Sequence, residues 1–465
     1  MLGDDRPARY ALGPYKLPVE PMVWPFSSGT TSERVFKELH AELALRRKLR
    51  ESRIAAQIVT PDNRIDLGGD RIAAELEREL GPGGERLLAR WHNGFEIARA
   101  LDPILAGEHA FPGVGFFERR EVGKLADSVA QMADAWWSEA QTDPTTQILT
   151  GLAAVALRHP APPPAAAARV IDAWYQGVSS LRGDGDAIRE LLLEKLITAG
   201  GEVRTGTVTE ASTSWGKISS LHLATGDEIG VGQVVSNHSP RDLSTWLGKR
   251  APKRLAELAD AMKIVGYRYT LNLLLDQAGV PEHMAPTVAV IATPGAPAVG
   301  DAGFSIHLGE SDDAGHVVAT VATVLPSDGP IEPERMAAKC MALRAGLWKR
   351  LADVMPFFDR HVVLAHSPFE ATPPHVPGGR GSYDVPRNLP LAMAPIWTGA
   401  VAATANLGAA PYLTGLKNLT LTGEQILPSL GLEGLLVAGW SAAKVACALA
   451  GKKKDYLRDE VVGAA

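Results

Sequence analysis

Apolar residues recur at helical spacing through most of the first third of the chain. The pattern predicts one helix over residues 31–50, a second over 70–80 that ends at Gly81, and mostly helical structure over 84–160. Between the first two helices, residues 55–67 alternate apolar and polar positions around a Pro-Asp-Asn turn. This alternation predicts two short strands joined by that turn.

The second half of the chain changes from helical periodicity to strand alternation. A helix is expected to begin near Asp184 and to stop at a Gly-Gly pair, and a β-meander is expected to run on to residue 235. Four strands follow between residues 264 and 325, and the first alternates tyrosine and leucine with other residues, which suggests one packed face. A long helix is predicted over residues 333–355 because proline suits its first turn.

Composition narrows the class of protein. A chain of 465 residues is too long for one simple core, so two domains are expected. The net charge of −6 provides no broad basic field, so nucleic acid is not an expected partner. Cys340 and Cys447 lie far apart in apolar helical patterns and are expected to be core residues of a protein from a reducing, cytoplasmic compartment.

The most informative stretch lies near the C-terminus. A short apolar strand leads to a Gly423-Glu424 turn, a loop with Gly431 and Gly434, and a helix of small residues. Free N–H groups at a helix start favour an anionic ligand, and glycine allows the backbone to approach it closely. The helix is also apolar enough to suggest a membrane span, but Glu433 and other polar residues interrupt it, so a buried packing helix is predicted.

The other half of a dinucleotide site is missing from the sequence pattern. A fingerprint G-x-G-x-x-G must lie between a strand and a helix of one βαβ unit. The segments that begin at Gly113, Gly183 and Gly230 each lack the third glycine. The histidines are scattered and no G-x-S-x-G segment occurs, so neither a metal site nor a hydrolase is indicated.

Three stretches together resemble one family. They are RGDGDAIRELLLEKLITAGGEVRTGTV, the meander that ends in VVSNHSPRDL, and TLTGEQILPSLGLEGLLVAGWSAA. They are similar to the FAD-dependent phytoene desaturases and carotenoid isomerase-like proteins, within the wider flavin amine oxidase group. The resemblance covers most of the chain from about residue 9 to residue 451, although the N-terminal dinucleotide unit of that family has no counterpart.

The resemblance implies which residues bind the cofactor. Gly423 and Glu424 would reach the ribityl and phosphate region of FAD, and the loop that opens the last helix would face the cofactor. Gly183 would precede the second helix of the cofactor domain, and backbone atoms of Val208 would lie by the adenine. The implied loop residues are Gly431, Leu432, Glu433 and Gly434.

The expected fold class is α/β, with an incomplete Rossmann-like FAD-binding domain built from discontinuous segments and a substrate domain of helices over an antiparallel sheet. The FAD-binding domain is assigned to residues 1–26, 165–242 and 408–451. The substrate domain is assigned to residues 27–164 and 243–407, and a tail to 452–465. The Pro162–Pro164 run is interpreted as a stiff crossing between the two domains.

Two functions remain open at this point. One is an FAD-dependent oxidoreductase that dehydrogenates or isomerises a polyene or another large apolar substrate, with the missing unit supplied by a longer product or a partner polypeptide. Tyr267, Tyr269, Met393 and Trp397 are candidates to line its substrate tunnel, with core packing as the stronger interpretation. The other is a flavin-free relative that acts as a binding or scaffold subunit. Peripheral membrane contact, a homo-oligomer and a complementing subunit are all compatible with the sequence, which identifies no catalytic residue.

Overall fold

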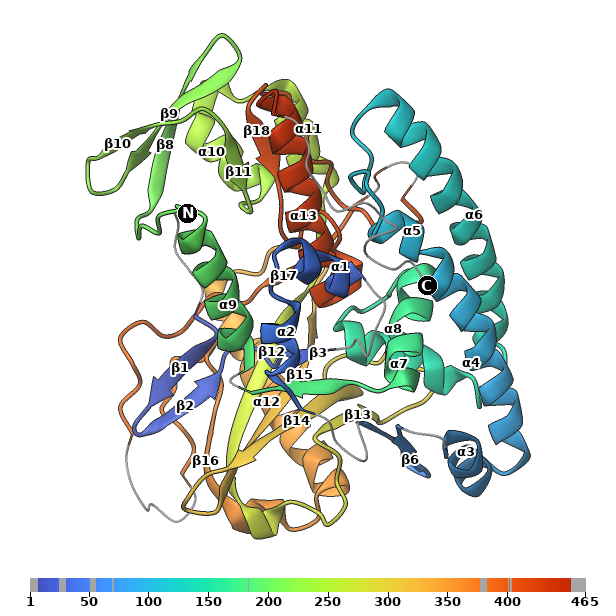
Figure 1. Cartoon of the computed structure of the whole chain (residues 1–465). Coiled ribbons are helices and arrows are strands. Elements are labelled where there is room, and N and C mark those ends of the chain that lie inside the picture. Colours follow the sequence, from blue (N-terminus) through green and yellow to red (C-terminus); the bar gives the residue numbers. More distant parts are fainter. Residues whose placement is uncertain are drawn as a thin grey trace.

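The computed structural model describes residues 7–24, 31–50, 56–68, 71–182, 184–376, 383–399, 401 and 404–452. These residues form a mixed α/β fold, so the expected fold class is confirmed (Figure 1). A large sheet with its covering helices occupies the lower and right parts of Figure 1. A smaller unit of β8 to β11, β18 and α13 lies above it.

The large sheet runs in the order β16-β12-β15-β14-β13-β5-β6, and β17 also pairs with β12. All these pairs are antiparallel except β5 with β13, which is parallel. The Pro-Asp-Asn turn joins β5 to β6, as the alternation predicts. The strands are β5 (Ala56–Val59), β6 (Arg64–Leu67), β12 (Lys263–Asp276), β13 (Thr287–Ile291), β14 (Gly303–Ser311), β15 (His316–Pro326), β16 (Val362–His366) and β17 (Pro395–Thr398).

Both faces of β12 are buried, which corrects the expectation of a single packed face. Every residue from Gly266 to Leu275 is buried. Alternate residues such as Tyr269 pack in one apolar cluster with α12 (Pro333–Val354). The opposite face carries polar side chains, among them Arg268 and Asn272. The Asn272 amide donates to the Pro18 carbonyl at 2.8 Å, so the N-terminal hairpin covers this second face.

A helical layer covers the β13 side of the sheet. Ala289 and Ile291 pack in the cluster that contains α7, whereas Val288 and Val290 point to the cluster of α12, as strand alternation requires. The Pro162–Pro164 run leads directly into α8. The layer consists of α3 (Ile72–Leu80), α4 (Pro82–Ala100), α5 (Asp102–Leu105), α6 (Phe116–Ala140), α7 (Gln147–Leu157) and α8 (Pro164–Gln176).

The smaller unit contains a parallel pair of strands. The expected meander does not continue through residue 235, because Val234–Ser236 (β11) leaves the hairpin and pairs with Leu419–Leu421 (β18). The side-chain amide of Asn418 stabilises this arrangement. It donates hydrogen bonds to the carbonyls of Ile218, in β9, and of Gly232, before β11. The neighbouring elements are β8 (Val208–Ser214), β9 (Lys217–Leu223), β10 (Glu228–Gly230), α10 (Pro240–Leu247), η1 (Gly248–Arg250) and α11 (Lys253–Ala261).

The N-terminal segment connects the two parts. The predicted helix over residues 31–50 is interrupted, because His40 adopts a left-handed φ of +50° between α1 and α2. The segment comprises β1 (Arg9–Leu12), β2 (Tyr15–Pro18), β3 (Val23–Trp24), α1 (Thr31–Glu38), α2 (Glu42–Arg46) and β4 (Leu49–Arg50), and it packs near β7 (Ser179–Leu181) and α9 (Asp184–Thr198).

The last helix, α13 (Gly431–Leu449), follows η5 (Pro428–Leu430). In the described part of the chain, it is the one helix long and apolar enough to cross a membrane by length and composition. The helix packs in the protein interior, as predicted, and its charged Lys444 side chain has hydrogen-bond acceptors there. The Lys444 Nζ donates to the carbonyls of Gly107 and His109 at 2.8 and 3.1 Å and lies over the Trp440 ring.

Candidate cofactor site

A cavity of about 170 Å³ lies where α13 begins. Four of the residues predicted to bind the cofactor line it: Glu424, Gly431, Leu432 and Glu433. The remaining walls come from the segment after β2, the end of α7, α8, β12 and β14. The fold therefore brings the C-terminal turn and the start of α13 to one cavity, next to residues more than 100 positions away in sequence.

Glycine has two different roles at the start of α13. Gly431 has a φ of +55° and no atom within 4 Å of the position of an added Cβ, so it makes a turn that leaves space beside the cavity. An added Cβ on Gly434 would lie 2.3 Å from the Leu427 carbonyl oxygen. Gly434 therefore allows α13 to pack closely on the turn before it.

Glu433 belongs to a buried ion pair. Its carboxylate accepts from Arg169 Nε and Nη2 at 3.1 and 2.9 Å, and Asp102 lies 2.8 Å from the same guanidinium. Burial alone would lower the pKa of Arg169, but the Glu433 and Asp102 carboxylates together outweigh it and raise that pKa. The Glu433 side chain therefore holds α13 against α8. The backbone of Glu433 is the part of the residue that is available to a ligand.

Glu424 lies in a second charged group on the cavity wall. Its carboxylate accepts a hydrogen bond from Arg268, and Glu20 accepts one from Arg158 at 3.0 Å. Burial lowers the pKa of Arg158. For Arg268 burial acts in the same direction, but Glu424 and Glu20 outweigh it and raise the pKa. Two guanidiniums and two carboxylates thus form a wall with no net charge.

Some donors in this wall have no acceptor among the described residues. They are Arg158 Nη1 and Arg268 Nε. His307 adds a neutral polar group, because burial and then Arg158 lower its pKa to about 3. Its Nε2 lies 2.8 Å from Ser305 Oγ. Opposite these groups the wall is apolar and includes Met22, Val170 and Trp174.

The Gly423-Glu424 turn lies between this cavity and a second hollow of about 730 Å³. Gly423 has a φ of +87°, and an added Cβ would lie 3.1 Å from the Asn237 Cβ. Asn237 lines the second hollow, as does Val208, which was predicted to lie by the adenine. Val208 therefore lines the second hollow and Gly431 lines the cavity, and the Gly423-Glu424 turn has one residue beside each. Gly183 lies outside the described residues.

The second hollow is bordered by an open sheet edge. In the described residues β11 pairs with β18 alone. Its ladder bonds run from the Val234 N–H to the Asn418 carbonyl and from the Thr422 N–H to the Ser236 carbonyl. Because bonding alternates along a parallel strand, the N–H and carbonyl of Val235 point to the other edge. Val235 is 49% exposed.

Sequence reasoning missed Glu20, Arg158, Arg268 and His307. Arg268 had a usable signal, because a charged residue within the apolar run YRYTLNLLL needs a buried partner. The tunnel candidates Tyr267, Tyr269, Met393 and Trp397 are not among the residues that line the cavity. The Tyr269 hydroxyl donates to Glu370 at 2.5 Å, so it belongs to a core network.

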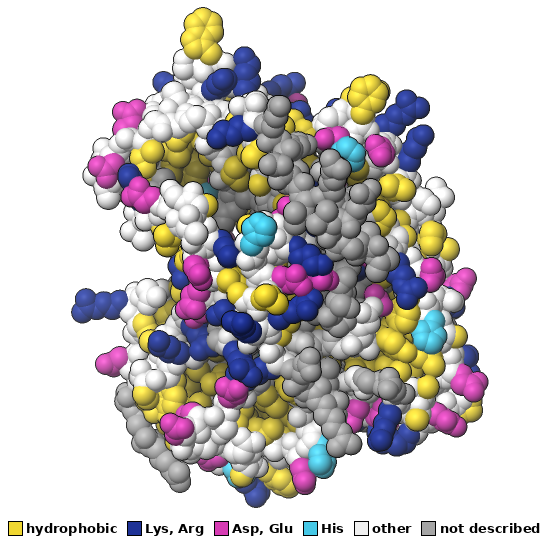
Figure 2. Space-filling model, in the orientation of Figure 1, with side chains coloured by type: hydrophobic (Ala, Val, Ile, Leu, Met, Phe, Trp, Pro, Cys, Tyr) yellow, Lys and Arg dark blue, Asp and Glu magenta, His cyan; other side chains and the backbone are white. Residues whose placement is uncertain are grey.

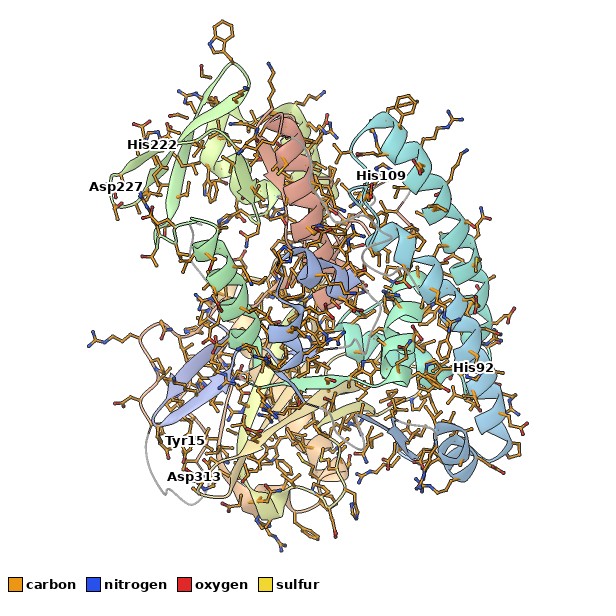
Figure 3. All side chains as sticks on the ribbon, in the orientation of Figure 1. Tyr15, His92, His109, His222, Asp227 and Asp313 are labelled. Carbon is orange, nitrogen blue, oxygen red and sulfur yellow. The ribbon has the colours of Figure 1, made fainter. Side chains whose placement is uncertain are left out.

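The described residues contain no group of three or more His, Cys, Asp or Glu side chains suited to a metal ion. Figure 3 shows this directly for three histidines. His92, His109 and His222 lie on separate parts of the molecule and do not converge.

No protein-family model and no curated protein sequence matches the chain. Its fold is similar to that of an oxidoreductase from Methanosarcina mazei, with 13% identity, a TM-score of 0.54, and coverage of 94% of this chain and 90% of that one. It is also similar to putrescine oxidase bound to putrescine, with 11% identity, a TM-score of 0.55, and coverage of 94% and 90%. A putrescine oxidase variant redesigned in cofactor binding gives 11% identity, a TM-score of 0.57, and coverage of 95% and 90%.

These residues fit one end of an FAD better than the other. The glycine turn with free space at Gly431 and the carboxylate of Glu424 suit the flavin and ribityl end. The described residues contain no G-x-G-x-x-G segment between a strand and a helix, so they supply no fingerprint cradle for the pyrophosphate. A cavity of about 170 Å³ is also smaller than the roughly 300–1,000 Å³ of typical ligand sites.

Proposed function

We propose that the chain is an FAD-dependent oxidoreductase whose cofactor site is completed by a glycine-rich βαβ unit. The observation that carries the proposal is the meeting of Glu424 and the Gly431 turn at one cavity. The fold shared with an oxidoreductase and with putrescine oxidase supports it. When bound, FAD supplies the hydride acceptor, and the chain supplies orientation and a dry wall.

The missing unit would pair with the free edge of β11. A two-stranded parallel pair is unusual in isolation, because parallel sheets are normally larger and covered on both faces. A third strand paired with β11 would satisfy the N–H and carbonyl of Val235. A longer product or a partner polypeptide would supply this strand together with the glycine turn that binds the pyrophosphate.

The class of substrate is also a proposal. A mostly apolar cavity of about 280 Å³ lies between the start of α6 and α11. Val122, Leu258 and Leu413 line it, together with Arg119 and Arg254. It supports an apolar substrate. The polyene or carotenoid expected from the sequence resemblance has no support from the names of the similar structures, one of which binds putrescine.

The visible spectrum of the purified chain tests the proposal. We expect flavin absorption bands when the chain is produced with a glycine-rich βαβ unit fused before residue 7, and weak or no bands without that unit. A Glu424→Ala change should lower flavin retention in the fused protein, whereas Glu96→Ala on the exposed face of α4 should not. A fused protein that folds but stays colourless would support the flavin-free alternative.

A further inference from the structure

Large apolar side chains are exposed at two tips of the same end of the molecule. Trp215, in the turn between β8 and β9, is 92% exposed. Phe116 and Phe117, in the first turn of α6, are 67% and 78% exposed. Figure 1 places the β8–β9 turn and the start of α6 together at the upper end, on opposite sides of the end of α13. Figure 2 shows an apolar side chain projecting from each tip.

The backbone makes Trp215 an unusual choice for its turn. Trp215 and Gly216 have φ values of +53° and +74°, the pattern of a two-residue hairpin turn that favours Asn-Gly. A bulky residue is disfavoured at such a φ, and this side chain packs against no core. Neither turn geometry nor packing explains the indole, so its exposure points to a binding role.

Basic side chains lie next to both tips. Lys217 and Lys417 are exposed beside the β8–β9 turn, and the Lys417 N–H donates to the Gly216 carbonyl at 2.9 Å. Exposed cations also follow Phe117 on α6, namely Arg119, Arg120 and Lys124. Acidic groups also lie in this region. Glu118, which accepts from the Gly115 N–H at 3.1 Å, and Glu121 both lie within 4 Å of His109, labelled in Figure 3, and Glu210 and Glu228 are exposed on β8 and β10.

We propose that this end of the molecule docks onto the surface of an anionic lipid bilayer. Exposed aromatic rings next to lysine and arginine are the combination that binds the membrane interface, where rings enter the headgroup layer and cations meet anionic lipids. A bilayer can accommodate two separate convex tips. A protein partner would need two preformed pockets at matched spacing. The apolar cavity between α6 and α11 lies at this end, so an apolar substrate would reach it from the bilayer.

Sedimentation with large vesicles tests the proposal on the full chain and does not depend on flavin. We expect the chain to bind vesicles that contain phosphatidylglycerol in phosphatidylcholine. Binding should weaken at least about tenfold with phosphatidylcholine alone, since each basic residue near an anionic surface contributes about a fivefold factor. It should also weaken as salt is raised.

Two variants remove the tips without disturbing the fold. Trp215→Asn keeps a residue that accepts positive φ, and should lower partitioning at least about tenfold, the effect of withdrawing one large apolar side chain from the bilayer. Phe116→Ser with Phe117→Ser should do the same. The matched control is Phe357→Ser, because Phe357 is 63% exposed and precedes η3 (Phe358–His361) and β16 at the opposite end.

Circular dichroism and the unfolding temperature establish that each variant is folded. If the double phenylalanine variant is unfolded, Trp215→Asn decides alone. Loss of binding in Trp215→Asn with retention in Phe357→Ser supports the proposal. Three results would overturn it: no sedimentation of the wild-type chain with anionic vesicles, wild-type binding by Trp215→Asn, or equal loss in Phe357→Ser.

Discussion

At the scale of single residues, the site is defined by charges that the fold buries in pairs. Arg169 and Glu433 are 6% and 2% exposed, so each charge depends on its partner for the solvation that water no longer supplies. Arg268 depends on Glu424 in the same way. These pairs connect α8 and β12 to the C-terminal segment, and thus hold the candidate cofactor residues in position.

Removing one partner of the buried Arg169–Glu433 pair is expected to destabilise the fold much more than replacing both partners with apolar residues. Glu433→Gln should lower the free energy of unfolding by about 3 kcal/mol, because buried Arg169 loses its bidentate carboxylate and keeps only that of Asp102. The double variant Arg169→Met with Glu433→Leu should recover most of this loss. Urea unfolding measures both. Equal destabilisation by Glu96→Gln, whose pair with Arg99 is exposed, would contradict the argument.

The buried His366 predicts that the protein loses stability as the pH falls below about 6.5. Burial lowers the pKa of His366 to about 4, from about 6.5 in the unfolded chain. Between these values the unfolded state binds more protons, so the stabilisation present above pH 6.5 is lost as the pH falls toward 4. His366→Gln should reduce the slope of unfolding free energy against pH in this window by about 1.4 kcal/mol per unit. An unchanged slope in urea titrations at pH 7, 6 and 5 would contradict this.

At the scale of elements, the open edge of β11 is the feature with the most direct consequence. Val235→Pro removes the N–H that faces this edge, and leaves the bonds of Val234 and Ser236 to β18 in place. We expect the isolated chain to unfold within a few degrees of wild type. In the fused protein the same change should abolish flavin retention, because the added strand cannot pair. Retention equal to wild type would show that this edge is not used.

The elements also show what sequence can and cannot predict. Periodicity placed the four strands from β12 to β15 and the helix α12, because local patterns are strong there. It missed the break at His40 and the departure of β11 from the hairpin. Both depend on distant partners, such as the Asn418 amide that bonds to Ile218 across 200 positions. The carboxylate of Glu424 was identified from a motif, whereas its partner Arg268 required the fold.

At the scale of the whole molecule, we propose functions for two separate regions of the chain. We propose that the cavity at Glu424 and Gly431 holds part of a flavin cofactor and that the rest of the site would form at the open edge of β11. The upper end in Figure 1 carries the aromatic tips, and the apolar cavity between α6 and α11 lies near them. A substrate taken from a bilayer would therefore enter the molecule at one end.

The central claim is that the C-terminal turn and the start of α13 bind FAD. The most direct measurement is a titration of FAD, followed by flavin fluorescence, into the chain fused before residue 7 to a glycine-rich βαβ unit. We predict one FAD per fused chain and at least about tenfold weaker binding by Glu424→Ala, the loss expected for a charge-assisted hydrogen bond. A folded fusion that binds no FAD, or that binds it equally well after Glu424→Ala, would contradict the account.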